Sequence, residues 1–326
     1  ALAGAPDPLA WTEEDAALLE AALRRARDVA GLFDGWEPES TPILLTKGRV
    51  NYLVNFPAGE GAPPGEPLAA GALAVVRLDR PEIPVVANGV WKIGQRPVAV
   101  VAGWRQLDQA LGGLEAGEGL LAGGEAGLLK GLMGAAAGER LTEEEYVGAV
   151  VHELFHVYQL PVAERWAAGW GEGHRQERLW YELYQDAENN RLQRREAEHL
   201  RAAVRAADEA GARQAVQAFL AVRDARAAYW RSRLGLDADP LLEVERLYEW
   251  LEGMARYVQA HAEAGGLDGL MDELGQPIGE GEPPRSRVYA LGAAQALALD
   301  RLSPGWRREA MQGVSLEALL RAAVAD

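Results

Sequence analysis

The segment AVVHELFHVYQ, residues 149–159, is mostly apolar, yet it contains His152, Glu153 and His156 within five positions. Burying such groups costs several kcal/mol unless each finds a partner. Residues four apart share one face of a helix, so the two imidazoles can converge on one ion. Glu153 lies about 100° round the helix from His152 and can reach a metal-bound water without ligating the metal. The spacing therefore predicts a helix over 141–160 that carries two zinc ligands and a general base.

Composition narrows the metal chemistry and the partners. The chain has 326 residues and no cysteine, so a metal must be bound by His, Asp, Glu or water. With 49 acidic and 33 basic residues the formal net charge is −16, and no face is obviously basic, which disfavours nucleic-acid binding. No apolar run approaches the roughly 18 residues that a membrane span needs. The opening Ala1-Leu2-Ala3 resembles the tail of a signal-peptide cleavage site, which predicts an exported protein, periplasmic or extracellular.

The first part of the chain is rich in predicted strands. Thr12 begins a capping box, which predicts a helix to about Ala30. Turn residues and β-branched runs then predict a strand-rich region. Its expected parts are a hairpin at 42–54 with a Lys47-Gly48-Arg49 turn, a Gly/Pro-rich loop at 57–67, and strands at 72–78, 83–87 and 97–102.

The second part is predicted to be helical. Thr142 begins another capping box, for the histidine helix, which should end before Pro161. Further helices are expected at 176–207, 211–234, 241–264, 288–302 and 315–324. Strands followed by helices indicate an α+β chain. We expect an N-terminal α+β domain at 1–140 and a helical domain at 141–326 that carries the zinc site, with a cleft between them.

A zinc hydrolase needs a third protein ligand and one open position. The remaining histidines, in a Gly-rich loop or on charged helix faces, are expected to be solvated: His174, His199 and His261. A carboxylate is therefore the expected third ligand.

Three glutamates are candidates for that ligand. Glu252 is followed by the small residues Gly253 and Ala255, which would let its helix approach the histidine helix closely. Glu182 and Glu188 remain open as alternatives. Asp186, four residues after Glu182, could orient a histidine from outside the ligand shell.

Two further motifs carry a family resemblance. HELFH at 152–156, followed by WLEGMARY at 250–257, resembles the gluzincin zinc metallopeptidases, specifically the peptidase-MA-like group, which pair H-E-x-x-H with a later E-G-x-A-x-Y helix. The similarity continues through YALG at 289–292 and DRLSPGW at 300–306, and covers roughly 146–323. The gap between the two main motifs is long, with two helices inserted.

The resemblance implies a zincin-like fold and a zinc-dependent peptidase acting on peptides or proteins. It assigns the third zinc ligand to Glu252, joining His152 and His156, with Glu153 as general base. Tyr289, or else Tyr257, would stabilise the oxyanion. Families of this kind bind the substrate backbone along an edge strand beside the zinc, and we expect that strand at 96–103.

Two other classes of function fit the same residues. One is a non-catalytic zinc-binding or interaction protein on the same scaffold, and the other is a zinc hydrolase of a non-peptide bond. Glu153 separates the first from a peptidase, because a structural zinc site needs no base. The oligomeric state and the cleavage specificity do not follow from the sequence.

Overall fold

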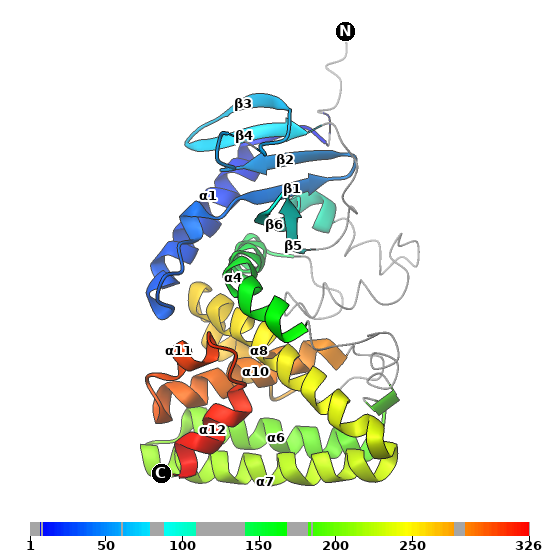
Figure 1. Cartoon of the computed structure of the whole chain (residues 1–326). Coiled ribbons are helices and arrows are strands. Elements are labelled where there is room, and N and C mark those ends of the chain that lie inside the picture. Colours follow the sequence, from blue (N-terminus) through cyan, green and yellow to red (C-terminus); the bar gives the residue numbers. More distant parts are fainter. Residues whose placement is uncertain are drawn as a thin grey trace. The chain divides into compact units, whose positions relative to one another are not determined.

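The structure is a computed structural model that describes residues 7, 9–59, 61–78, 88–108, 141–167, 182–183, 185–276 and 284–325. The described residues form two compact units. Unit 1 comprises those up to Gly31 and those from Gly35 to Leu160, and unit 2 comprises Leu32–Asp34 and those from Pro161 onward. The boundary predicted at residue 140 falls at the end of an undescribed range. Strands in one part and helices in the other make this an α+β protein, as predicted (Figure 1).

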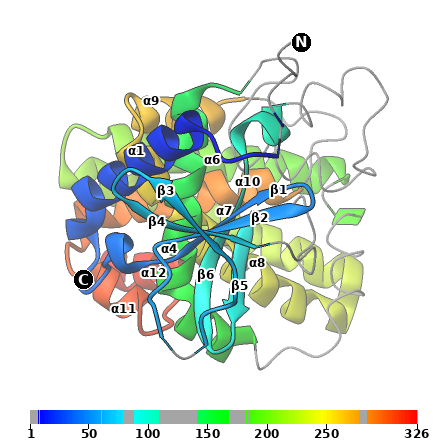
Figure 2. The ribbon, with the colours of Figure 1, turned by 90° about the horizontal axis from the view of Figure 1, so that it is seen from above.

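Unit 1 is built on a six-stranded mixed sheet in the order β3-β4-β2-β1-β6-β5. Only β1 and β6 pair in parallel; the other neighbours are antiparallel. The strands fan out across the sheet in Figure 2, as sheet twist requires. Their bounds are β1 Ile43–Lys47, β2 Val50–Val54, β3 Glu66–Ala70, β4 Leu73–Leu78, β5 Gly89–Ile93 and β6 Arg96–Ala102.

The β1–β2 hairpin confirms the prediction made from its turn. Lys47 pairs with Val50, so only Gly48 and Arg49 form the loop. Gly48 has a φ of +64°, which glycine adopts without a steric penalty and which suits a two-residue hairpin. The strands at 72–78 and 97–102 are likewise confirmed as β4 and β6, while 83–87 lies outside the described residues.

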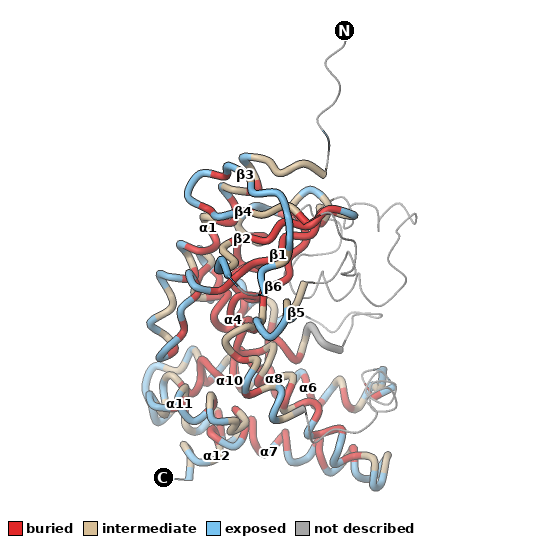
Figure 3. Tube along the Cα trace, turned by 45° about the horizontal axis from the view of Figure 1, so that its top comes forward, coloured by how far each residue is buried: buried red, intermediate tan, exposed pale blue. Residues whose placement is uncertain are grey.

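Strands β3 and β5 were not predicted, and β3 begins inside the expected loop at 57–67. Strand β3 is mostly exposed and β5 is half-buried to exposed, and neither has a clear apolar alternation. Figure 3 shows the contrast between buried β1 and exposed β3. Each is formed by pairing with a neighbour across a tight turn, at Gly71 and at Gly94, both with positive φ. Pairing, which is a tertiary effect, therefore decided these two strands.

The prediction of an edge strand at 96–103 is wrong. In the described sheet β6 lies between β1 and β5, so its backbone is paired on both sides. The edges of that sheet are β3 and β5. The error arose because the nearest strand before the histidine helix in sequence is not the outermost strand in space.

Helix α1 (Glu13–Val29) is joined to the sheet of unit 1 by a buried ion pair. The predicted capping box at Thr12 is present, and its partner Asp15 also accepts a hydrogen bond from Lys47 Nζ at 2.7 Å. Both charged side chains are nearly inaccessible, at 6% and 2%. A short 3-10 helix follows at Ala30–Leu32, and another at Pro38–Ser40.

Helix α4 (Glu143–Ala167) carries the two histidines. It begins as predicted, because Thr142 Oγ1 accepts from the Glu145 amide and Glu145 accepts from the Thr142 amide. The prediction that it ends before Pro161 is wrong, since Pro161 lies inside the helix. Proline has no N–H, so the helix lacks the hydrogen bond that residue 161 would otherwise donate to the Val157 carbonyl. The φ of proline is nevertheless compatible with a helix that continues. The chain passes from unit 1 to unit 2 at this proline.

Unit 2 is helical (Figure 1). Helices predicted at 211–234, 241–264, 288–302 and 315–324 are confirmed within a few residues, whereas α9 and α11 were not predicted because they are short. Of the helix predicted at 176–207, residues 176–181 lie outside the described residues and 182–183 are helical, but the helix is not continuous. After a break at 185–186, α6 begins at Ala187, where Asp186 caps it by accepting from the Asn189 amide. The bounds are α6 Ala187–Arg205, α7 Glu209–Leu234, α8 Ala238–Ala262, α9 Gly266–Glu273, α10 Pro284–Leu302, α11 Trp306–Ala310 and α12 Leu316–Ala325, with a 3-10 helix at Gly235–Asp237.

Helices α8 and α10 meet backbone to backbone at two glycines. A Cβ on Gly253 would lie 2.4 Å from Gly292 Cα, and a Cβ on Gly292 would lie 2.2 Å from the Glu249 carbonyl oxygen. Helix interiors disfavour glycine by about 1 kcal/mol relative to alanine, so close packing explains both residues. The expectation that Gly253 admits the histidine helix is corrected, because the space at Gly253 is taken by α10.

Gly253→Ala is expected to destabilise the protein by about 2 kcal/mol or more, because backbone atoms cannot move aside as a side chain can. The measurement is urea unfolding at pH 7. Gly269→Ala on α9 is the matched control, since no atom lies within 4 Å of its added Cβ. The control should be neutral or up to about 1 kcal/mol more stable. Equal stability of Gly253→Ala and the wild type would contradict the close contact.

A buried network of ion pairs joins three helices of unit 2. Arg226 of α7 donates to Glu196 of α6 at 2.7 Å and, through two nitrogens, to Glu245 of α8 at 2.9 and 2.8 Å. Arg223, one turn earlier, donates to Glu249 at 3.0 and 2.6 Å. All five residues are at most 2% exposed. Removing one member would leave a buried charge without its partner, which typically costs several kcal/mol.

Glu317 of α12 extends this network. Burial alone would raise its pKa, but the positive charges of Arg223 and Arg246, with hydrogen bonds from Arg321 and Arg246, lower it to about 2. A depressed pKa means that Glu317 stabilises the fold above its ordinary pKa of 4.5, and that this stabilisation is lost as the pH falls towards 2.

Glu317→Gln should therefore lower the free energy of unfolding by about 2–3 kcal/mol at pH 7. The difference from the wild type should shrink steadily between pH 5 and about pH 2, as the carboxylate of the wild type is protonated. Denaturant unfolding at several pH values measures it. Glu309→Gln, at an exposed position of α11, is the control and should differ from the wild type by less than about 0.5 kcal/mol throughout. A difference for Glu317→Gln that does not change with pH would contradict this role.

Candidate metal centre

His152, Glu153 and His156 are all buried in the middle of helix α4. His152 is 0% exposed, Glu153 2% and His156 8%. The two imidazole rings are 4.6 Å apart between centroids and nearly perpendicular, as expected for side chains four residues apart on one face. The helix is buried on more than one side, because Val151, Leu154 and Phe155 are each inaccessible to solvent. Each polar group therefore needs a partner within the protein or a bound ion.

Gln159 orients His156. The Gln159 side chain is fully buried, and its Oε1 lies 2.9 Å from His156 Nδ1. With the amide oxygen as acceptor, Nδ1 carries the proton and Nε2 keeps its lone pair for a ligand bond. This role of Gln159 was not predicted from the sequence. Its position three residues after His156, on the same helix face, is the signal that could have indicated it.

Among the described residues, one group of three side chains could hold a metal ion: His152, His156 and Glu252. The possible ligand atoms of this group all lie within 4.8 Å of one another. Glu252 is half-buried on α8, next to the glycine that packs against α10. The donor set, two imidazole nitrogens and one carboxylate oxygen, suits a metal of zinc type.

The alternative third ligands do not join this group. Glu182 is exposed, and Glu188 forms a surface ion pair with Arg191 at 2.6 Å. The hydrogen bond from Arg191 lowers the pKa of Glu188. Asp186, considered as a carboxylate that orients a histidine, instead caps α6 and accepts a hydrogen bond from the Tyr229 hydroxyl.

The other histidines have different surroundings. His174 lies outside the described residues, and His199 is half-buried on α6. His261 was expected to be solvated, but it is also half-buried: its Nδ1 lies 2.9 Å from the Tyr257 carbonyl oxygen and its ring packs on the Tyr257 ring. Within the described part of the chain, neither His199 nor His261 belongs to a group that could hold a metal.

Tyr257 and Tyr289, the two candidates for stabilising the oxyanion, lie in different surroundings. Tyr257 is fully buried in unit 2, where its hydroxyl lies 2.8 Å from Asp300 and also accepts from Arg307. Burial, reinforced by Asp300, raises the pKa of Tyr257. These contacts are those of a structural tyrosine. Tyr289 is 3% exposed on α10, and its role in catalysis stays a prediction.

Comparison with protein-family models, with curated proteins and with solved structures finds no match for this chain. The metallopeptidase resemblance therefore depends on the quoted motifs alone. No described helix combines the length and the apolar character that crossing a membrane requires.

We expect the protein to bind one zinc ion per chain, and His152→Ala or His156→Ala to abolish that binding. Glu252→Ala should weaken it by more than the roughly 10–100-fold that loss of an outer hydrogen-bond partner causes. Titration calorimetry with zinc, checked by elemental analysis after dialysis, measures this. Glu182→Ala and Glu188→Ala are the controls and should bind as the wild type does. If a control variant loses zinc while Glu252→Ala keeps it, the third ligand has been assigned to the wrong residue.

Proposed function

We propose that this chain is a zinc-dependent peptidase of the gluzincin type, with a zincin-like fold. The observation that carries the proposal is the group formed by His152, His156 and Glu252. Two histidines and one glutamate are a known ligand set of catalytic zinc, and three protein ligands leave one position open for water or substrate.

The residues present fit such an ion. Both histidines are buried, so their imidazoles gain more from a ligand bond than from water that cannot reach them. Gln159 holds His156 with Nε2 available, which is the kind of outer hydrogen bond that fixes metal-binding histidines. When bound, zinc supplies Lewis-acid chemistry, polarising a carbonyl and lowering the pKa of water towards 7.

Glu153 supplies the proton transfer. It is buried and directly follows His152 in sequence, but it is not one of the three residues of the candidate metal group. A carboxylate there takes a proton from the attacking water and delivers it to the leaving amine. A site whose only purpose is stability would need no such group, which favours an enzyme over a structural zinc protein.

The glycines of the second motif also support the resemblance. Gly253 is the glycine of the E-G-x-A-x-Y motif, and Gly292 is the glycine of the YALG segment at 289–292. These two glycines touch where α8 meets α10. The two motifs therefore form one packing unit around the helix that carries Glu252. This shared packing requirement supports the resemblance.

Glu153→Gln should keep zinc and lose hydrolysis by roughly 10²–10⁴-fold, because an amide cannot accept the proton. Cleavage of a mixed peptide library, followed by mass spectrometry, measures the rate, and zinc content is measured in parallel. Glu143→Gln, at an exposed position in the first turn of the same helix, is the control and should retain activity. If the Glu153→Gln variant cleaves peptides at the wild-type rate, Glu153 is not the general base. A zinc-loaded wild type that cleaves no peptide would favour a non-catalytic zinc protein or a non-peptide substrate.

A further inference from the structure

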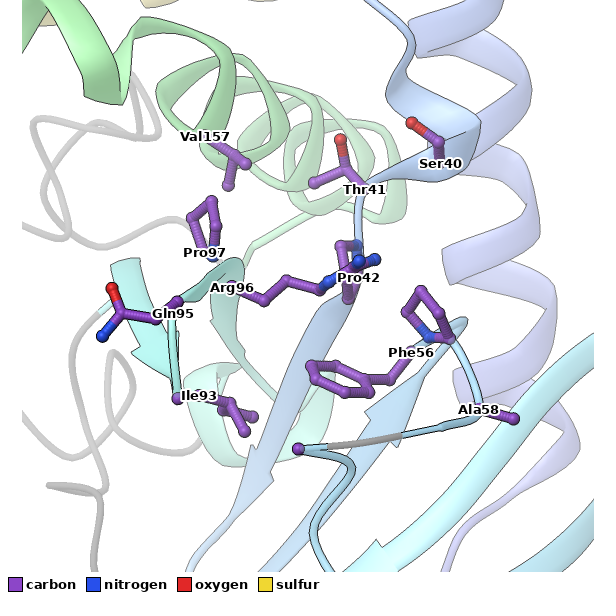
Figure 4. Close-up of a pocket in the computed structure, with 13 residues that line it drawn as sticks. Ser40, Thr41, Pro42, Phe56, Ala58, Ile93, Gln95, Arg96, Pro97 and Val157 are labelled. Atoms are coloured by element: carbon purple, nitrogen blue, oxygen red, sulfur yellow. The ribbon is translucent and has the colours of Figure 1, made fainter.

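Unit 1 contains a cavity of about 630 Å³ at one end of its sheet. The segment before β1, the segment after β2 and the β5–β6 turn surround it, and Val157 of α4 lies on one side (Figure 4). Its volume lies within the range of small-ligand sites. Because Val157 directly follows His156, the helix that carries the candidate ligands also forms a wall of this cavity.

The lining of the cavity is mixed: apolar side chains lie beside the polar side chains of Ser40, Thr41 and Gln95 and one cation, Arg96. Pro42, Phe56, Ile93 and Pro97 contribute apolar surface, and Arg96 extends across the cavity towards Pro42 in Figure 4. The Arg96 guanidinium carbon lies 5.9 Å from the centre of the Phe56 ring. A cation over an aromatic face is held in position while its N–H edge stays available for a ligand.

Arg96 differs from most arginines of unit 1 in its charged neighbours. Among the described residues no carboxylate lies within 4 Å of its guanidinium, although the chain has 49 acidic and 33 basic residues. By contrast, four arginines of the same unit form ion pairs: Arg24–Glu20, Arg25–Glu144, Arg27–Glu39 and Arg105–Glu14. Arg96 is exposed at the cavity, so in such an acidic chain its charge is available for a ligand that enters the cavity.

We propose that this cavity binds a carboxylate of the substrate, with Arg96 as its partner and the apolar lining around its stem. The guanidinium and a carboxylate form paired, charge-assisted hydrogen bonds, the strongest recognition that a single side chain offers an anion. The carboxylate belongs either to an acidic side chain or to the C-terminus of a peptide. This assignment of substrate class rests on the proposed peptidase function, because the cavity adjoins the histidine helix.

The test uses three N-acetylated pentapeptides with the sequence Ala-Leu-Xaa-Leu-Ala. One has Glu at the centre and an amidated C-terminus, the second has Gln and an amide, and the third has Gln and a free C-terminal carboxylate. Binding is measured calorimetrically on zinc-loaded Glu153→Gln protein, which is expected not to cleave them. At least one carboxylate peptide should bind about tenfold more tightly than the neutral one. The peptide that does so identifies the source of the carboxylate.

Arg96→Gln, added to that protein, should reduce the preference to within about twofold, because the neutral amide cannot pair with a carboxylate. Arg49→Gln is the matched control, since Arg49 is exposed in the turn at the other end of the β1–β2 hairpin, and it should keep the preference. Equal binding of all three peptides, a preference that survives Arg96→Gln, or no binding below about 10 mM would each overturn the proposal.

The outcome is separable from that of the proposed function. If the wild type cleaves all three peptides at the same rate, the peptidase proposal stands and the assignment of the cavity to a carboxylate is wrong. If a carboxylate preference depends on Arg96 but the wild type cleaves none of the peptides, the cavity assignment stands and the peptidase proposal is wrong.

Discussion

The cost of burying two imidazoles and a carboxylate in an apolar helix is the constraint on which the candidate site depends. His152, Glu153 and His156 are each less than a tenth exposed, in a helix whose neighbouring side chains are apolar. Without partners, these groups would cost several kcal/mol, a large fraction of the stability of a typical domain. Gln159 satisfies one nitrogen of His156, and a metal ion bound with Glu252 would satisfy further groups.

Unit 2 holds its helices together by two different means. Gly253 and Gly292 let α8 and α10 approach until their backbones touch, which leaves no room for any other residue type. One and two turns before Gly253 on α8, Glu249 and Glu245 meet buried arginines of α7, which also bind Glu196 of α6, in a network of charge-assisted hydrogen bonds. The first contact needs the absence of side chains, whereas the second needs complete pairing of charges. Both make the position of the helix that carries Glu252 sensitive to single substitutions.

Helix α4 contributes neighbouring residues to the candidate metal group and to the cavity that we propose binds a carboxylate. One residue of α4, His156, belongs to the candidate metal group, and the next, Val157, lines the cavity that contains Arg96. Consecutive residues point about 100° apart, so one helix can serve two neighbouring sites. Pro161, four residues beyond Val157, is tolerated inside this helix. A rigid element shared in this way would keep a bound carboxylate at a constant offset from the histidines.

The sequence by itself determined the capped starts of α1 and α4, the hairpin at Gly48, most helices of unit 2 and the pairing of two histidines on one face. Each of these follows from local rules: side chains that cap nearby amides, a glycine that permits positive φ, and the period of a helix. The tertiary structure alone decided what depends on residues distant in sequence. It formed β3 and β5 by pairing, placed β6 inside the sheet, matched Gly253 to Gly292, and grouped Glu252 rather than Glu182 or Glu188 with the histidines. Surface glutamates and a ligand glutamate look alike in sequence, because the difference between them is the environment that folding supplies.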